Sequence, residues 1–161
     1  MNSPPVENIR LRGAVGADAA LIEAATGATG SAPWSRAQVL AELSLAASRA
    51  YVAEDADEGS PAGILVARLA ADELEILQLH VAADRRRLGI ATALLGHAVA
   101  QESGLDRVWI EVRADNEGAR GFYEASGFEP AGTRSGYYRD GEAAIVMSRP
   151  RRLAPGGREG T

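Results

Sequence analysis

Residues 84–95 join two patterns of regular structure through a short arginine-rich turn that contains one glycine. The preceding residues 74–81 have the apolar composition of a strand. Residues 89–103 repeat apolar side chains as the buried face of a helix does. A glycine at the first helical turn lets the main chain approach a ligand closely. Because the first N–H groups of a helix are unpaired and lie at the positive end of its dipole, this order predicts a socket for phosphate or pyrophosphate. The alternative is an exposed basic loop before an ordinary helix.

Short strand and helix patterns alternate along the rest of the chain. Strands are predicted at residues 9–12, 51–54, 62–69, 108–112, 130–134 and 143–149, and helices at residues 17–25, 35–47 and 115–123. An acidic turn with Gly and Pro joins residues 51–54 to residues 62–69, which indicates an antiparallel hairpin. Ser35 and Gln38 form a capping box, and Gly127 ends the last helix. Hairpins combined with strand–helix–strand units predict an α/β (α+β mixed) fold around a mixed sheet.

The chain of 161 residues has the length of one domain. We expect residues 1–8 to be a flexible leader and residues 9–149 to form the folded domain. Residues 150–161, rich in Gly, Arg and Pro, are predicted to be a disordered tail. The first residues lack the basic and apolar segments of a signal peptide, and no apolar run has the length of a membrane span. These features predict a cytoplasmic protein.

Composition argues against several kinds of site. Without cysteine, the chain has no disulfide, no thiolate metal site and no cysteine nucleophile. The two histidines, His80 and His97, are well separated in the sequence, so no metal site is expected. The formal charge of −5 argues against general affinity for nucleic acids, although arginines cluster at residues 85–87 and 149–152.

Glu111 is a carboxylate in the middle of a strong strand pattern. The period of two puts Trp109 and Glu111 on the face opposite to the apolar residues of this strand. Partial burial of a carboxyl group favours its use as a general base. Alternatively, Glu111 lies on an exposed strand face and pairs with a neighbouring arginine, Arg107 or Arg113.

Other polar and aromatic residues also have two interpretations. The hydroxyl of Tyr123 either protonates a leaving group such as a thiolate or belongs to a core tyrosine. Asn116 either hydrogen-bonds a ligand or caps the helix that follows it. Trp34 either closes a substrate pocket or fixes a loop to the core. Tyr137 and Tyr138, near a predicted turn, either line a peptide groove or cover the sheet.

Several motifs resemble the GCN5-related N-acetyltransferase (GNAT) superfamily. The acetyl-CoA loop of that superfamily, Gln/Arg-x-x-Gly-x-Gly/Ala, is matched by Arg86-Arg87-Leu88-Gly89-Ile90-Ala91. The segments at residues 109–116 and 119–128 resemble the ribosomal-protein-alanine N-acetyltransferase (RimI) branch, as do residues 33–35 and the closing residues 137–147. The similarity covers residues 9–148.

The resemblance implies a GNAT acyl-CoA N-acyltransferase fold, in which a largely antiparallel mixed sheet is splayed at its middle strands and flanked by helices. It implies direct acetyl transfer from acetyl-CoA in a ternary complex. Glu111 matches the general base that takes a proton from the substrate ammonium through water. Tyr123 matches the general acid that protonates the departing CoA thiolate.

The resemblance also assigns binding residues. Cofactor contacts are implied for Leu79, His80, Val81, Arg86, Arg87, Leu88, Gly89, Ile90, Ala91, Thr92 and Asn116. Trp34, Tyr137 and Tyr138 match the substrate groove of the family. The implied partner is the N-terminus of a ribosomal protein or peptide, without nucleic acid or membrane.

The sequence departs from the family pattern at four places. Ala91 replaces the second Gly of the loop, which the motif tolerates, and Gly121 lies within the short helix. Gln78-Leu79-His80 is bulkier than expected on the central strand. Ala143 stands where the branch often carries Asp, so recognition of the substrate amine is expected to differ.

The predicted function is acetylation of a protein N-terminal α-amine, with the Ala terminus of a small-subunit ribosomal protein as substrate. One alternative is acetylation of a lysine side chain or a small-molecule amine. Another is a non-catalytic acyl-CoA-binding module. A nucleotide-phosphate binder is disfavoured because the loop lacks the Gly-Lys-Ser/Thr of a P-loop. The oligomeric state is left open.

Overall fold

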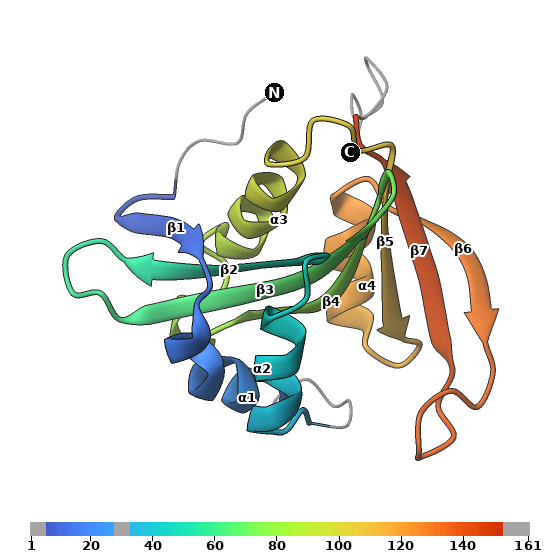
Figure 1. Cartoon of the computed structure of the whole chain (residues 1–161). Coiled ribbons are helices and arrows are strands. Elements are labelled where there is room, and N and C mark those ends of the chain that lie inside the picture. The colour runs from blue at the N-terminus through green and yellow to red at the C-terminus, as the bar shows by residue number, and fades with distance from the viewer. Residues whose placement is uncertain (1–5, 28–32, 153–161) are drawn as a thin grey trace. The chain divides into compact units, whose positions relative to one another are not determined.

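A computed structural model describes residues 6–27 and 33–152 of the chain. The chain divides into two compact units. Unit 1 comprises Met1–Leu69 and Leu77–Ser103, and unit 2 comprises Ala70–Ile76 and Gly104–Thr161. The strands form a mixed seven-stranded sheet in the order β1-β2-β3-β4-β5-β7-β6, which confirms the predicted fold class. Figure 1 labels the helices and strands of both units.

In unit 1, three neighbouring strands pair antiparallel. They are β1 (Ile9–Gly13), β2 (Ser48–Asp55) and β3 (Pro61–Ala70). The helices of this unit are α1 (Ala19–Gly27), α2 (Arg36–Leu43) and α3 (Ile90–Ala100), with short 3-10 turns at η1 (Gly16–Asp18) and η2 (Ala83–Arg85). The strand β4 (Glu73–Val81) begins in unit 2 and ends in unit 1.

The strands β2 and β3 are covered on both faces (Figure 1). On one face, Val52 and Ile64 pack in a cluster with Ile22 of α1 and with α2. On the other face, Tyr51 meets His97 of α3 edge to face, with ring centroids 4.9 Å apart. Because both faces are buried, these strands are nearly continuous apolar runs and show little alternation in sequence.

The capping box predicted before α2 is present. The Ser35 hydroxyl accepts a hydrogen bond from the Gln38 main-chain N–H at 3.2 Å, and the Ser35 N–H donates to Gln38 Oε1 at 2.7 Å. The helix ends at Leu43, before the predicted end at residue 47. The carbonyl of Ala47 accepts a hydrogen bond from the Leu69 N–H at 2.8 Å, so this residue extends the strand pairing instead.

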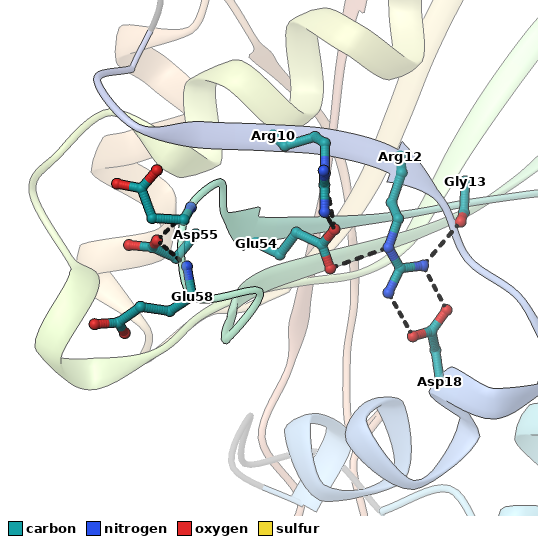
Figure 2. A network of polar contacts seen from close by, with 8 residues as sticks. Arg10, Arg12, Gly13, Asp18, Glu54, Asp55 and Glu58 are labelled. Atoms are coloured by element: carbon teal, nitrogen blue, oxygen red, sulfur yellow. Dashed lines mark hydrogen bonds and ion pairs between the residues drawn. The ribbon is translucent and has the colours of Figure 1, made fainter.

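A charged network joins β1 to β2 and to the turn before α1 (Figure 2). Glu54 accepts hydrogen bonds from Nε of Arg10 at 2.9 Å and from Nε of Arg12 at 3.1 Å. Arg12 also donates to both carboxylate oxygens of Asp18, at 2.9 and 2.8 Å. The bond from Arg12, opposed by burial and assisted by the Val15 N–H, lowers the pKa of Asp18.

The predicted hairpin of β2 and β3 is confirmed, and its turn is organised by Asp55. The Asp55 carboxylate accepts hydrogen bonds from the N–H groups of Asp57 and Glu58, both at 2.9 Å. These two bonds lower the pKa of Asp55. Gly59 completes the turn with a φ of 72°, a conformation that glycine adopts readily.

In unit 2, the first residues of β4 pair in parallel with β5 (Arg107–Arg113), from Glu73 opposite Arg107 to Ile76 opposite Ile110. The strand β5 pairs antiparallel with β7 (Ala144–Pro150), and β7 pairs antiparallel with β6 (Glu129–Arg134). The helix α4 (Glu117–Ala125) lies between β5 and β6 in sequence.

Burial along β5 alternates as the sequence predicted. Val108, Ile110 and Val112 are buried, whereas Trp109 and Glu111 are partly exposed. One face of β5 therefore belongs to the core of unit 2, and the other carries the candidate base.

The other expectations for the chain have mixed outcomes. The helix predicted at residues 89–103 is α3, which ends at Ala100. The strand β7 continues through Pro150, so this residue belongs to the sheet and not to a tail. Residues 1–5 and 153–161, which hold most of the predicted leader and tail, lie outside the described residues. The predicted splay of the sheet and the domain boundaries stay predictions.

Across residues 6–27 and 33–152, no helix has both the length and the apolar character of a membrane span.

Candidate active site

The arginine-rich loop leads into the N-terminus of α3. Arg87 and Gly89 both have positive φ angles, 66° and 83°, a region that glycine enters without strain and arginine rarely adopts. Gly89 is the N-cap of α3, and no side chain caps this helix. The N–H groups of Ile90, Ala91 and Thr92 therefore have no partner within the helix. They can donate hydrogen bonds to an anion at the positive end of the helix dipole.

The arginines before α3 are held differently. Arg85 pairs with Asp55, with a distance of 3.2 Å between Nη1 and Oδ2. Nε of Arg86 donates to the carbonyl oxygen of Val81 at 3.3 Å. The side chain of Arg87 is exposed. The loop is thus fixed to the β2–β3 turn and to the end of β4, and it presents positive charge to solvent.

The last residues of β4 lie in front of this loop in sequence. Leu79, His80 and Val81 are half-buried. Burial, assisted by the positive charge of Arg86, lowers the pKa of His80. The imidazole is therefore neutral at pH 7 and adds no charge to this end of the strand.

Glu111 lines a cavity of about 240 Å³ that lies within unit 2. The walls of the cavity combine acidic, basic and apolar side chains, from Ala70, Glu73, Glu75, Trp109, Ile110, Glu111, Arg134 and Val146. The Glu111 side chain is 23% exposed, and its Oε1 lies 3.1 Å from Nε of Arg134. The carboxylate is therefore reachable from solvent and held by one cation.

Glu111 pairs with an arginine, as its alternative interpretation expects, but the partner is Arg134 and not one of the two neighbouring arginines named there. Arg107 donates a hydrogen bond to the Ser148 hydroxyl at 3.0 Å. Arg113 pairs with Asp115 and Asp140, at 3.1 and 2.6 Å. The partner comes instead from β6, because the pairing of β5, β7 and β6 brings Arg134 to the same face of the sheet.

Tyr137 and Tyr138 lie in the turn between β6 and β7 and pack edge to face, with ring centroids 5.2 Å apart. Interaction with the Glu111 carboxylate, together with burial, raises the pKa of Tyr137. The guanidinium of Arg134 lies 5.7 Å from the ring centroid of Tyr137, and that of Arg113 lies 4.7 Å from the ring centroid of Tyr138. The rings of both tyrosines thus make cation–π contacts with arginines of unit 2.

Tyr123 is buried on α4. Its ring packs edge to face against Phe122 and Phe128, with centroid distances of 5.0 and 5.2 Å. Burial raises the pKa of Tyr123 above its ordinary value of 10.0. The phenol therefore keeps its proton at neutral and mildly alkaline pH, as a general acid must. Tyr123 is not among the residues that line the Glu111 cavity.

Asn116 and Trp34 have structural contacts. The side-chain oxygen of Asn116 accepts a hydrogen bond from the Ala119 N–H at 3.1 Å and so caps α4. Trp34 packs against the α1–α2 core of unit 1, and its main-chain N–H donates to the Thr26 hydroxyl at 3.0 Å. The ligand contacts predicted for these two residues stay predictions.

The structure brings Glu111 and Tyr137 together, as a predicted base and a predicted substrate residue. Arg134 and Glu73 also belong to this site but were not predicted from the sequence. No sequence pattern around Arg134 or Glu73 marks it as a site residue, because β6 is exposed along its length and Glu73 begins an ordinary strand. Across the described part of the chain, no group of three or more Asp, Glu or His side chains is arranged to hold a metal ion.

Comparison with known sequences supports an enzymatic family. Residues 20–128 match the sequence model of the Acetyltransferase (GNAT) family. The chain is 36% identical over 97 residues to the [ribosomal protein bS18]-alanine N-acetyltransferase of Escherichia coli (strain K12). This match covers 57% of the present chain and 66% of that protein, just under two thirds of its length.

Comparison with solved structures gives the same family. The crystal structure of the ribosomal-protein-S18-alanine N-acetyltransferase from Escherichia coli matches with a TM-score of 0.79 and 26% identity, over 91% of this chain and 96% of that chain. The crystal structure of nourseothricin acetyltransferase matches with a TM-score of 0.72 and 28% identity, over 90% of this chain and 99% of that chain. From its sequence and its fold, the chain belongs to the acetyltransferase (GNAT) family.

Proposed function

We propose that this chain transfers the acetyl group of acetyl-CoA to the α-amine of a protein N-terminus, with the Ala terminus of a small-subunit ribosomal protein as substrate. The family match and the similarity to the Escherichia coli enzyme support this substrate class. Transfer is direct, within a ternary complex. The absence of cysteine from the sequence agrees with this, because no thiol is available to carry the acetyl group.

Unit 1 has the features required to hold acetyl-CoA. The uncapped N-terminus of α3 and the positive φ at Gly89 suit close approach by a pyrophosphate. In the proposed complex, the main chain of residues 86–92 binds the pyrophosphate, and the main chain of residues 79–81 binds the pantetheine arm. When bound, acetyl-CoA supplies a thioester whose carbonyl carbon is attacked by the amine.

The observation that carries the proposal is the placement of Glu111 in a cavity that also holds Glu73 and Glu75. Three carboxylates share this cavity with one guanidinium, that of Arg134. The excess of negative charge favours an acceptor that arrives as an ammonium ion over a neutral or anionic one. Glu111 then accepts a proton from the ammonium through water, which leaves the amine nucleophilic.

Tyr123 supplies the second proton transfer. Since burial keeps its phenol protonated, Tyr123 can donate a proton to the CoA thiolate as the carbon–sulfur bond breaks. The attacking nitrogen loses its remaining excess proton to water as the amide forms, and solvent restores the Tyr123 phenol and the Glu111 carboxylate after release of the products.

Replacement of Glu111 tests the proposal. In Glu111→Gln, we expect kcat for an Ala-initiated peptide to fall by about 10²–10⁴-fold, the usual contribution of a general base. The Kd of CoA should be unchanged. The matched control is Glu129→Gln, since Glu129 is an exposed carboxylate on β6. Wild-type turnover in Glu111→Gln would contradict the proposed base.

A second candidate function is acetylation of a small-molecule amine. It is favoured by the similarity to nourseothricin acetyltransferase, whose 28% identity is close to that of the ribosomal-protein enzyme in the structural comparison. The aromatic turn at Tyr137 and Tyr138 favours the peptide, because aromatic side chains bind extended chains through large apolar faces.

A further inference from the structure

We propose that Arg134 and Tyr137 are positioning residues for Glu111. They hold one side of its carboxylate so that the other side faces the acceptor amine. This inference rests on the proposed function, in which Glu111 is the general base. It adds two residues of the β6–β7 segment to the catalytic apparatus and gives Tyr137 a task other than lining a peptide groove.

Three parts of unit 2 meet at the Glu111 carboxylate. Glu111 lies on β5, Arg134 is the last residue of β6, and Tyr137 belongs to the turn that follows. Nε of Arg134 lies 3.1 Å from Glu111 Oε1, and the ring of Tyr137 lies against the guanidinium of Arg134. The carboxylate is thus paired with a cation that a tyrosine of the same short segment of chain supports.

Arg134 and Tyr137 also contact each other. The guanidinium of Arg134 lies 5.7 Å from the ring centroid of Tyr137, within the range of a cation–π interaction. The ring of Tyr137 therefore restrains the guanidinium. A displacement of the ring changes the direction from which Arg134 reaches Glu111.

The Arg134–Glu111 ion pair is expected to contribute little to the free energy of folding. The Arg134 side chain is 58% exposed, and Glu111 is 23% exposed. Water screens ion pairs of this kind, and they contribute little to folding. The ion pairs of Arg113 are less exposed to water on the arginine side than the Arg134–Glu111 pair. The Arg113 side chain is only 14% exposed, and it pairs with both Asp115 and Asp140.

Orientation of the catalytic carboxylate explains the Arg134–Glu111 ion pair better. The terminal torsion of a glutamate is broad, so an unrestrained carboxylate samples many orientations. A general base must lie within hydrogen-bond reach of the proton that it takes, directly or through one water. The Arg134 guanidinium at Oε1 narrows these orientations and leaves the other lone pairs of the Glu111 carboxylate available to accept a proton.

The test compares positioning variants in two backgrounds. Arg134→Gln, Arg134→Lys and Tyr137→Leu are made in the wild-type chain and in Glu111→Gln. In the wild-type background, we expect Arg134→Gln to lower kcat for an Ala-initiated peptide by about 10-fold to 100-fold, as a misplaced catalytic group does. Arg134→Lys should recover part of this loss, and the KM for acetyl-CoA should not change.

In the Glu111→Gln background, the same substitutions should lower kcat no further, because they act through the missing carboxylate. An equal loss in both backgrounds would overturn the inference, as would wild-type kcat in Arg134→Gln. The control is Arg139→Gln, an exposed arginine of the same turn, which should leave kcat unchanged. Wild-type turnover in Glu111→Gln itself would refute the proposed base, and this result is distinguishable from failure of the positioning pair.

Discussion

Gly63 of β3 lies so close to the main chain of β4 that a Cβ atom at this position would be 2.9 Å from the carbonyl oxygen of His80. The same Cβ would be 3.2 Å from the Leu94 side chain of α3. Glycine at residue 63 therefore permits close packing of β3 against the end of β4 and α3, and these last two elements carry proposed acetyl-CoA contacts.

Gly63→Ala should lower the free energy of unfolding by about 1–3 kcal/mol. The added methyl group would clash with the main chain of β4, which can shift only at an energetic cost. The measurement is urea unfolding followed by circular dichroism. The control is Gly96→Ala on α3, where nothing lies within 4 Å of the added Cβ. This control should raise the free energy of unfolding by about 0.5–1 kcal/mol. Equal stability of the two variants would contradict the packing at Gly63.

Gly89→Ala tests the proposed pyrophosphate site without any need for turnover. The φ of 83° at Gly89 strains any residue with a Cβ, so the first turn of α3 should shift. We expect the Kd of CoA, measured by isothermal titration calorimetry, to rise by about 10-fold. Gly141→Ala introduces similar strain in the turn between β6 and β7, at a φ of 87°, and should leave the Kd unchanged. Wild-type CoA binding in Gly89→Ala would contradict a pyrophosphate site at the N-terminus of α3.

Asp18 should make the stability of the chain depend on pH in the acid range. Its hydrogen bonds with Arg12 lower its folded-state pKa below the ordinary value of 3.8. The Asp18 interaction is therefore fully present above the ordinary pKa, and it is lost as the pH falls through the lowered one. The urea midpoint should be steady from pH 7 to about pH 5 and should fall below about pH 4.

Asp18→Asn should weaken this acid dependence and lower the free energy of unfolding at pH 7 by about 2–3 kcal/mol, since Arg12 loses charge-assisted hydrogen bonds. Asp57→Asn removes an exposed carboxylate from the β2–β3 turn and serves as the matched control. If both variants retained the full acid dependence, the Arg12–Asp18 pair would not be its source.

Tyr123→Phe removes the proposed general acid and keeps the ring that packs against Phe128. We expect kcat to fall by about 10²-fold with little change in the melting temperature. Tyr51→Phe, which removes the hydroxyl of a buried tyrosine in unit 1, should leave kcat within about twofold of wild type. A parallel loss in both variants would indicate a general effect of removing a buried hydroxyl and not proton donation by Tyr123.

The periodic elements were predictable because local patterns determine them. The alternation of β5 places Glu111 on the correct face, and the Ser35–Gln38 box marks the start of α2. The end of α2 was missed because Leu45, Ala46 and Ala47 fit a helix equally well. In the structure, residues 44–47 form a turn, and the carbonyl of Ala47 accepts a hydrogen bond from the Leu69 N–H just before β2 begins.

The partners of the candidate site were not predictable from periodicity. A strand pattern tells which face carries Glu111, but it does not tell which residue of another strand lies opposite. The choice of Arg134 over Arg107 or Arg113 depends on the register of β5, β7 and β6. The same limit applies to Arg12 and Asp18, which are joined by the turn after β1.

The most direct test of the proposed function is mass spectrometry of the chain incubated with acetyl-CoA and a panel of acceptors. The panel contains an Ala-initiated peptide from a small-subunit ribosomal protein, the same peptide with a blocked N-terminus, an internal-lysine peptide, a polyamine and nourseothricin. A single acetyl group on the free Ala terminus alone is the predicted result. Acetylation of lysine, polyamine or nourseothricin in its place would contradict the proposed substrate class, and CoA binding without any transfer would contradict catalysis.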